Sequence, residues 1–186
     1  MRKGGGKSKG ASFERDICRR LSLWISNGQQ EDVYWRSAMS GGRSTVAFKS
    51  RGLKLAAQSG DLSCLEAIGA AFAKTFFVEM KFYKDLKYAS LLTGKGHLAD
   101  FWRIAVIEAK RYDKLPLLIA KQNQLPVTVC LSRMGVVQLG LEMHQVLIVP
   151  PLDMRVVLFD TYLKYADRIN RHAADPIPGQ VDRPQS

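Results

Sequence analysis

The hydrophobic positions near the N-terminus recur at the spacing of an α-helix. Phe13, Ile17 and Leu21 lie four residues apart, so their side chains fall on one face of a helix. Ser12 precedes the first of them and has the side chain of a good N-cap. The pattern therefore predicts a helix from Ser12 to about Ser26.

Further along the chain, short apolar runs bounded by Gly, Pro and polar residues predict β-strands. The best is Thr75 to Phe82, because Phe-Phe-Val at its centre favours extended structure. Further strands are expected at 33–36, 61–65, 116–120, 127–131, 146–149 and 155–159, and further helices at 97–113 and 160–172. The order helix, strands, helix, strands, helix predicts an α/β domain whose mixed β-sheet is flanked by helices.

Three segments lack such a pattern. Residues 1–10 consist of Gly, Lys, Arg and Ser after one Met, which predicts a flexible basic arm. Residues 37–60 are rich in Ser, Gly, Arg and Lys and too long for a plain connection, which indicates a functional loop. Residues 173–186 carry three prolines and are expected to be disordered. The folded domain is therefore expected to span residues 11–172.

The charge of the chain points to a polyanionic partner. Lys and Arg outnumber Asp and Glu 28 to 17, giving a formal net charge of +11 and a pI near 9.8. Nucleic acid is the commonest partner of so basic a protein, because each neutralised phosphate releases a counterion. An anionic membrane surface is the competing partner, but no basic amphipathic helix stands out and no apolar run is long enough to span a bilayer. We expect a nucleic-acid-binding protein without membrane association.

The cysteines and aromatic residues suggest no separate chemistry. Cys18, Cys64 and Cys130 lack zinc spacing, and their odd number argues against a disulfide framework, so buried thiols in a reducing compartment are expected. The basic N-terminus lacks the apolar run of a signal peptide, which favours a cytoplasmic protein. Trp35 and the other tryptophans are expected in the core, because they form no interleaved stacking series.

Three residues in and before the strand 75–82 form a candidate catalytic set. Glu79 and Lys81 are two residues apart, so they point to the same side of a strand, while Asp61 begins the preceding strand. If these two strands are neighbours, two carboxylates and one ammonium converge. Two carboxylates can hold Mg²⁺ that keeps water and phosphate oxygens as its other ligands. Such an ion activates water for phosphodiester hydrolysis, and Lys81 can orient that water or stabilise the developing charge.

A second Glu-x-Lys pair competes with this interpretation. Glu108 and Lys110 repeat the spacing, and Asp100 lies upstream of them. The apolar residues around them fit a helical period, so this copy is interpreted as a helix face. The pair Glu79 and Lys81 is by itself equally compatible with a solvated strand face. The spacing alone leaves both sites open.

An ordered series of motifs adds information that no single pair carries. The series comprises Gly10-Ala11-Ser12-Phe13-Glu14-Arg15, Trp35-Arg36-Ser37 with Ser40-Gly41-Gly42, Gly60-Asp61, and Phe77-Val78-Glu79-Met80-Lys81. Over residues 10–130 it resembles the PD-(D/E)XK nuclease superfamily, and within it the archaeal-type Holliday junction resolvases and related phage-encoded nucleases. Gly60 stands where the superfamily name has proline, and the stretch between Gly42 and Asp61 is longer than in the resolvases.

The resemblance implies a role for each matching residue. Asp61 and Glu79 would be the main metal ligands, with Glu14 as a helix-borne carboxylate near the metal, and Lys81 the catalytic lysine. The residues expected to meet DNA are Arg15, Arg36 and the loop residues Ser40, Gly41, Gly42 and Arg43. Lys121, after the expected strand 116–120, is a further candidate for a backbone contact, with an ordinary surface lysine as the alternative.

The implied protein is an endonuclease of restriction-endonuclease-like fold. It would use Mg²⁺, with Mn²⁺ as a substitute, to hydrolyse DNA phosphodiester bonds. The resolvase resemblance further implies branched DNA such as a Holliday junction as substrate, a homodimer, and action in the cytoplasm of a phage host. Two alternatives fit the sequence: a catalytically inactive DNA-binding or structural module on the same fold, and an RNA-binding protein, which the charge alone allows.

Overall fold

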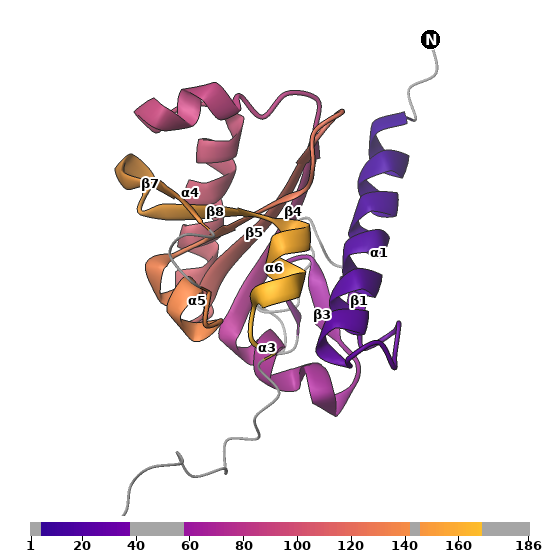
Figure 1. Ribbon diagram of the computed structural model, residues 1–186. Helices are drawn as coiled ribbons and strands as arrows, with labels where there is room; N and C mark the ends of the chain where they lie inside the picture. The colour runs from indigo at the N-terminus through magenta and orange to yellow at the C-terminus, as the bar shows by residue number, and fades with distance from the viewer. Residues whose placement is uncertain (1–4, 38–57, 142–145, 169–186) are drawn as a thin grey trace, which may run out of the picture.

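The computed structural model describes residues 5–37, 58–141 and 146–168 (Figure 1). Most of the expected loop 37–60 lies outside these ranges, including Ser40, Gly41, Gly42 and Arg43. The C-terminal segment 173–186 lies outside them as well. Within the described residues, no helix is long and apolar enough to cross a membrane.

Helices are interspersed among the strands along the chain. The α-helices are α1 (Gly5–Ile25), α3 (Ala70–Thr75), α4 (His97–Arg111), α5 (Arg133–Gln138) and α6 (Phe159–Tyr165). The 3₁₀ helices are η1 (Ala67–Gly69), η2 (Tyr88–Thr93) and η4 (Pro150–Leu152). The strands are β1 (Tyr34–Arg36), β2 (Gln58–Ser59), β3 (Leu62–Cys64), β4 (Phe76–Tyr83), β5 (Leu115–Gln122), β6 (Thr128–Leu131), β7 (Leu147–Val149) and β8 (Met154–Leu158).

A five-stranded mixed sheet forms the centre of the molecule, as expected. Its order is β4-β5-β6-β8-β7; β4 and β5 are parallel, and the remaining pairs are antiparallel. Helix α1 covers one face and α4 the other (Figure 1). A small antiparallel sheet, β1-β3-β2, adjoins the free edge of β4 through a bridge between Gly60 and Val78.

The side chains of β4 alternate between the two faces of the sheet. Val78 and Met80 belong to the core cluster beneath α1, and the Phe82 ring lies 5.7 Å from that of Phe13 on this helix. Glu79 and Lys81 therefore point to the opposite face, toward α4. The Phe101 ring of α4, whose centre is 5.9 Å from the Lys81 Nζ, lies on that side.

Several expected boundaries were wrong. Helix α1 begins at Gly5 rather than Ser12, so residues 5–10 are helical and not a flexible arm. Residues 5–10 contain only Gly, Lys and Ser, so no apolar period could mark this part of the helix. Residue Phe159 starts α6 instead of ending a strand, and α6 stops at Tyr165. The short helices α3 and α5 were not expected, because six residues are too few to show a period.

Asp61 was expected in a strand, but it lies in a turn just before β3. Gly60 has φ +78°, and a Cβ atom there would lie 2.2 Å from the Val78 carbonyl oxygen. Only glycine accepts this backbone conformation and this approach together. The Asp61 N–H can then donate to the Val78 oxygen at 2.8 Å, which places Asp61 beside Glu79 on the neighbouring strand.

Replacing Gly60 with alanine should destabilise the fold more than the same change at Gly28. Both glycines have positive φ, but a Cβ at Gly28 would meet nothing within 4 Å. We expect Gly28→Ala to cost about 1 kcal/mol from backbone strain, and Gly60→Ala at least about 2 kcal/mol because a steric clash is added. Urea unfolding measures both, and equal losses would contradict the close approach at Val78.

Candidate active site

Asp61 is held in place by hydrogen bonds on three sides. Its N–H donates to Val78 O at 2.8 Å, and its carbonyl oxygen accepts from Ser37 N at 2.8 Å. Its carboxylate Oδ2 accepts from the Met80 N–H at 2.8 Å, and the residue is 6 % exposed. Burial raises the pKa of Asp61, against the opposing effects of the Met80 N–H and the Lys81 ammonium. A backbone-anchored carboxylate thus lies in a poorly solvated position.

Glu79 lies next to Asp61 on β4. Its side chain is 17 % exposed and forms an ion pair with Lys81, two residues along the same strand. Burial and the nearby Asp61 carboxylate raise the pKa of Glu79, while Lys81 lowers it. Like charges held this close repel, so an additional cation near the two carboxylates would lower their energy.

Lys81 is the cation that the chain itself places beside these carboxylates. Burial lowers the pKa of Lys81, but the negative charges of Glu79, Asp61 and Glu14 raise it further, and the net pKa is raised. The amine therefore stays protonated at neutral pH. It can act as a fixed positive charge or hydrogen-bond donor, and it cannot act as a general base.

Glu14 and Arg36 complete the cluster from the side of α1. The Arg36 Nε lies 3.0 Å from Glu14 Oε2, and the two residues belong to α1 and β1. Both atoms are buried, yet neither completes a well-directed hydrogen bond within the described part of the chain. Glu14 is also close enough to raise the pKa of Asp61, after the larger effect of burial. Its carboxylate has more acceptor sites than this one contact with Arg36 uses.

The donor set fits a hydrated divalent ion better than a closed metal cage. Among the residues that the structure describes, no group of three or more His, Cys, Asp or Glu could hold a metal by itself. Mg²⁺ typically uses one or two carboxylates and fills its other positions with water and phosphate oxygens. Asp61 and Glu79 supply two such carboxylates, and the unsatisfied Glu14 Oε2 can accept a hydrogen bond from a water.

The competing Glu-x-Lys pair lies on a helix, as expected. In α4, Asp100 pairs with Arg103 at 3.0 Å and Glu108 pairs with Arg111 at 2.5 Å. These are ordinary ion pairs between residues three apart on a helix surface. Glu108 adds only the smallest of the effects on the pKa of Glu79. In the described part of the chain, no backbone N–H donates to either of these acids as Met80 N–H does to Asp61.

The expected DNA contacts are only partly placed. Arg15 is exposed on α1 one residue after Glu14. Lys121 lies at the end of β5, where its Nζ is 5.7 Å from the Phe82 ring, on the α1 face of the sheet. The loop residues Ser40 to Arg43 lie outside the described ranges. Arg15 and Arg36 therefore form a basic flank beside Glu14.

Trp35 was expected in the core, but it is 50 % exposed. The preceding residue, Tyr34, is only 1 % exposed. Because side chains alternate along a strand, the Trp35 ring points to the opposite side of β1, away from the core. The adjacent Arg36 turns back toward Glu14. The exposure of Trp35 could have been inferred from the sequence, because neighbouring residues of a strand point to opposite sides and Tyr34 precedes it.

The sequence was compared with known proteins in three ways. The sequence model of a family described as "Phage putative PDDEXK endonuclease" matches residues 5–152. This range contains the acidic cluster of Glu14, Asp61 and Glu79, and also Lys81. Searches of curated proteins and of solved structures returned no match.

Asp61→Asn should stabilise the protein at neutral pH. The folded-state pKa of Asp61 is raised, so the cost of its buried charge is absent at low pH and appears as pH rises through that pKa. The neutral amide removes this cost and still accepts from Met80 N–H. We expect Tm to rise by roughly 2–4 °C at pH 7, or about 1 kcal/mol, and the gain to shrink near pH 3.5. Asp16→Asn on the exposed face of α1 is the control. An equal loss of Tm in Asp61→Asn at both pH values would contradict the raised pKa of Asp61.

Proposed function

The chain belongs to the family of phage putative PDDEXK endonucleases, and from this premise we propose that it is a metal-dependent nuclease acting on DNA. The family match confirms the superfamily, and the phage-encoded relatives, that the motifs indicated. The mixed sheet between α1 and α4 is the restriction-endonuclease-like arrangement expected for it. One observation carries the proposal: Asp61 and Glu79 converge with Lys81 at the free edge of β4.

The proposed reaction is hydrolysis of a phosphodiester bond by water. In this proposal Asp61 and Glu79 hold the divalent ion, Mg²⁺ or in its place Mn²⁺. The bound ion supplies a water of lowered pKa and neutralises charge on the scissile phosphate. The Met80 N–H keeps one Asp61 oxygen fixed at β4, where Glu79 is the residue before Met80. Glu14 accepts a hydrogen bond at the α1 side of the site and helps to orient the attacking water.

Lys81 stabilises the charge that develops during the reaction. As the water oxygen bonds to phosphorus and gives a proton to solvent, negative charge grows on the phosphate oxygens. The bond between phosphorus and the leaving oxygen breaks, and that oxygen takes a proton from solvent. The pKa of Lys81 is raised by its carboxylate neighbours, so its ammonium is present throughout. Lys81 now forms an ion pair with Glu79, and it would exchange this carboxylate for a phosphate oxygen.

Backbone contacts to DNA are assigned to the basic flank around the cluster. Arg15 and Arg36 lie beside Glu14, and Lys121 lies at the end of β5 on the same face of the sheet. The overall charge of +11 supports binding to a polyanion that weakens steeply with salt. We assign the loop Ser40 to Arg43 to the same DNA, on the motif resemblance alone.

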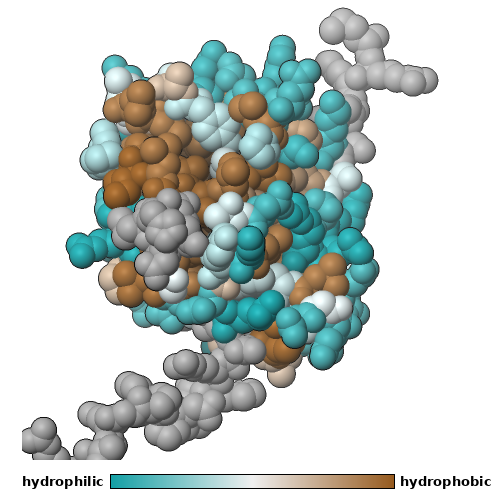
Figure 2. All heavy atoms as spheres, in the orientation of Figure 1, coloured by the Kyte–Doolittle hydropathy of each residue, from teal (hydrophilic) through white to brown (hydrophobic). Residues whose placement is uncertain are grey.

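Branched DNA and a homodimer are further parts of the proposal. Both come from the resemblance to the resolvases. The same resemblance implies that the protein acts in the cytoplasm of a phage host. The dimer has one supporting feature: the edge strand β7 exposes Leu147 by 59 % and Ile148 by 45 %. Figure 2 shows apolar atoms gathered over this part of the molecule. An apolar sheet edge favours association. Light scattering tests the dimer, since its mass would be twice the 20.8 kDa of the chain.

Substitutions in the two acidic sets should separate the active site from the α4 surface. We expect Asp61→Ala, Glu79→Ala and Lys81→Met each to lower the rate of DNA cleavage with Mg²⁺ by roughly 100-fold or more, because each removes charge at the reacting phosphate. DNA affinity should change by only a few-fold. Asp100→Ala and Glu108→Ala are the matched controls and should cleave at the wild-type rate.

The substrates are a four-way junction and a linear duplex of the same sequence, with EDTA as the metal-free control. The junction should be cleaved faster; equal rates would remove the branched-DNA part of the proposal. Wild-type cleavage by Asp61→Ala or Glu79→Ala would overturn the site. Salt-sensitive DNA binding without any cleavage by the wild type would favour an inactive binding module. Preference for RNA in direct competition would favour an RNA-binding protein.

A further inference from the structure

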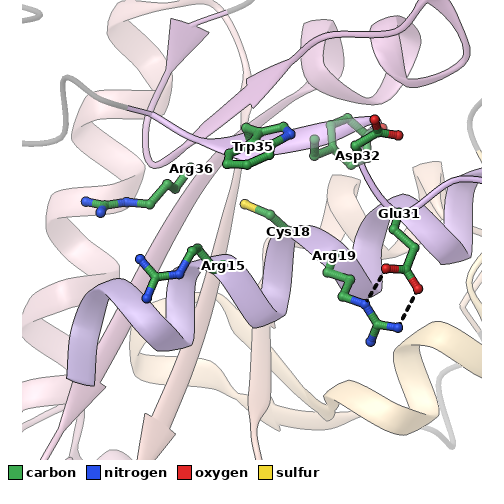
Figure 3. A pocket seen from close by; sticks show the side chains of 8 residues that line it. Arg15, Cys18, Arg19, Glu31, Asp32, Trp35 and Arg36 are labelled. Carbon is green, nitrogen blue, oxygen red and sulfur yellow. Dashed lines mark hydrogen bonds and ion pairs between the residues drawn. The ribbon is translucent and has the colours of Figure 1, made fainter. Parts of the chain in front are cut away.

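A cavity of about 270 Å³ lies between α1 and β1, beside the acidic cluster but separate from its proposed metal ligands (Figure 3). We call it the α1–β1 cavity. Its lining residues come from α1, from β1 and from the connection between them: Arg15, Cys18, Arg19, Glu31, Asp32, Tyr34, Trp35 and Arg36. Arg36 also contacts Glu14, so the cavity adjoins the site at one end.

Most of the surface that lines the cavity is apolar, although five of its eight lining residues are charged. Trp35 lies over it from β1, and Cys18 points into it from α1 (Figure 3). Burial raises the pKa of the Cys18 thiol to about 12, so this wall is uncharged at neutral pH. Trp35 is half exposed, although a ring of its size normally covers apolar surface. The cavity therefore offers a flat π surface above an uncharged wall.

Charge is distributed unevenly along the cavity. Arg15 and Arg36 lie together at the end near Glu14 (Figure 3). At the other end, Arg19 is neutralised by Glu31, whose Oε2 accepts from Arg19 Nε at 2.8 Å. Within the described part of the chain, Arg15 forms no ion pair with an acidic residue. The end next to the active site is therefore the one that attracts an anion.

These features match a single nucleotide. A nucleotide has a flat aromatic base and, at one side, an anionic phosphate. Bases stack on tryptophan irrespective of their identity, because every base has a π face. Guanidinium groups bind phosphate through charge-assisted hydrogen bonds. In a duplex both faces of a base are covered by its neighbours, so only an unstacked base can reach Trp35.

We propose that the α1–β1 cavity binds one unstacked nucleotide of the DNA substrate, next to the phosphate that is cleaved. Its base lies against Trp35, and its phosphate lies at Arg15 and Arg36. The inference deepens the proposed nuclease function and rests on it for the identity of the ligand. It makes DNA with an unpaired nucleotide near the scissile bond the preferred substrate class, and it gives Trp35 a binding role that recognises this feature.

Binding without metal tests the proposal independently of cleavage. The probes are a duplex with one unpaired 2-aminopurine and a fully paired duplex of the same sequence, both in EDTA. We expect Trp35→Ala to weaken binding of the first probe by roughly ten- to a hundred-fold and binding of the paired duplex by less than two-fold. Wild-type protein should quench the 2-aminopurine fluorescence by stacking, and Trp35→Ala should not.

Two further variants serve as controls. Tyr165→Ala on α6 removes a ring of similar exposure, 46 %, and should leave both affinities unchanged. Trp35→Phe keeps a stacking surface and should restore most of the affinity; it also serves if Trp35→Ala does not fold, which thermal unfolding reveals. Equal loss on both probes, no loss on either, or quenching that persists in Trp35→Ala would overturn the proposal. If the wild type cleaves no DNA but shows the Trp35-dependent preference, the nuclease function fails and the nucleotide site stands.

Discussion

The candidate site depends on one close backbone approach, between Gly60 and the Val78 carbonyl of β4. Because Gly60 has no Cβ, the chain can bridge to the free edge of β4, and Asp61 N–H reaches the Val78 oxygen at 2.8 Å. This contact places the Asp61 carboxylate against Met80 N–H and beside Glu79. In the superfamily motif a proline precedes this acid; here the same place is held by a glycine that permits a contact no other residue could make.

The contact brings the buried Asp61 carboxylate next to the partly buried Glu79 carboxylate, which is unfavourable for folding. Burial raises the pKa of Asp61 and of Glu79, and the Asp61 carboxylate raises the pKa of Glu79 further. Both carboxylates raise the pKa of Lys81. A fold selected for stability alone would not keep this arrangement. The charges remain because Lys81 partly neutralises them and because, in the proposed function, a divalent ion and a phosphate complete the balance. The cavity next to Glu14 follows the same principle: among the described residues Arg15 has no acidic partner, so its charge is available for a phosphate.

Much of this could be predicted from the sequence, where local pattern and tertiary structure agree. Glu79 and Lys81 share a face because strand side chains alternate, and the second Glu-x-Lys pair, Glu108 with Lys110, lies on a helix as its apolar period indicated. The start of α1 was missed because residues 5–10 carry no large apolar side chain, so no apolar period marks them. The sequence shows that Gly60 replaces the proline of the superfamily motif, but it does not show why. The role of Gly60 depends on its contact with the Val78 carbonyl, 18 residues further along the chain. Trp35 was expected in the core because the tryptophans form no interleaved stacking series, and only its alternation with the buried Tyr34 indicates its exposure.

The central claim is that Asp61 and Glu79 bind the divalent ion. Anomalous diffraction from crystals of the protein soaked in Mn²⁺ tests it most directly, because the ion is located without any assumption about activity. The account predicts one strong peak between the Asp61 and Glu79 carboxylates, within about 2.0–2.4 Å of an oxygen of each. A peak at Asp100 and Glu108 on α4, with none at Asp61, would contradict it.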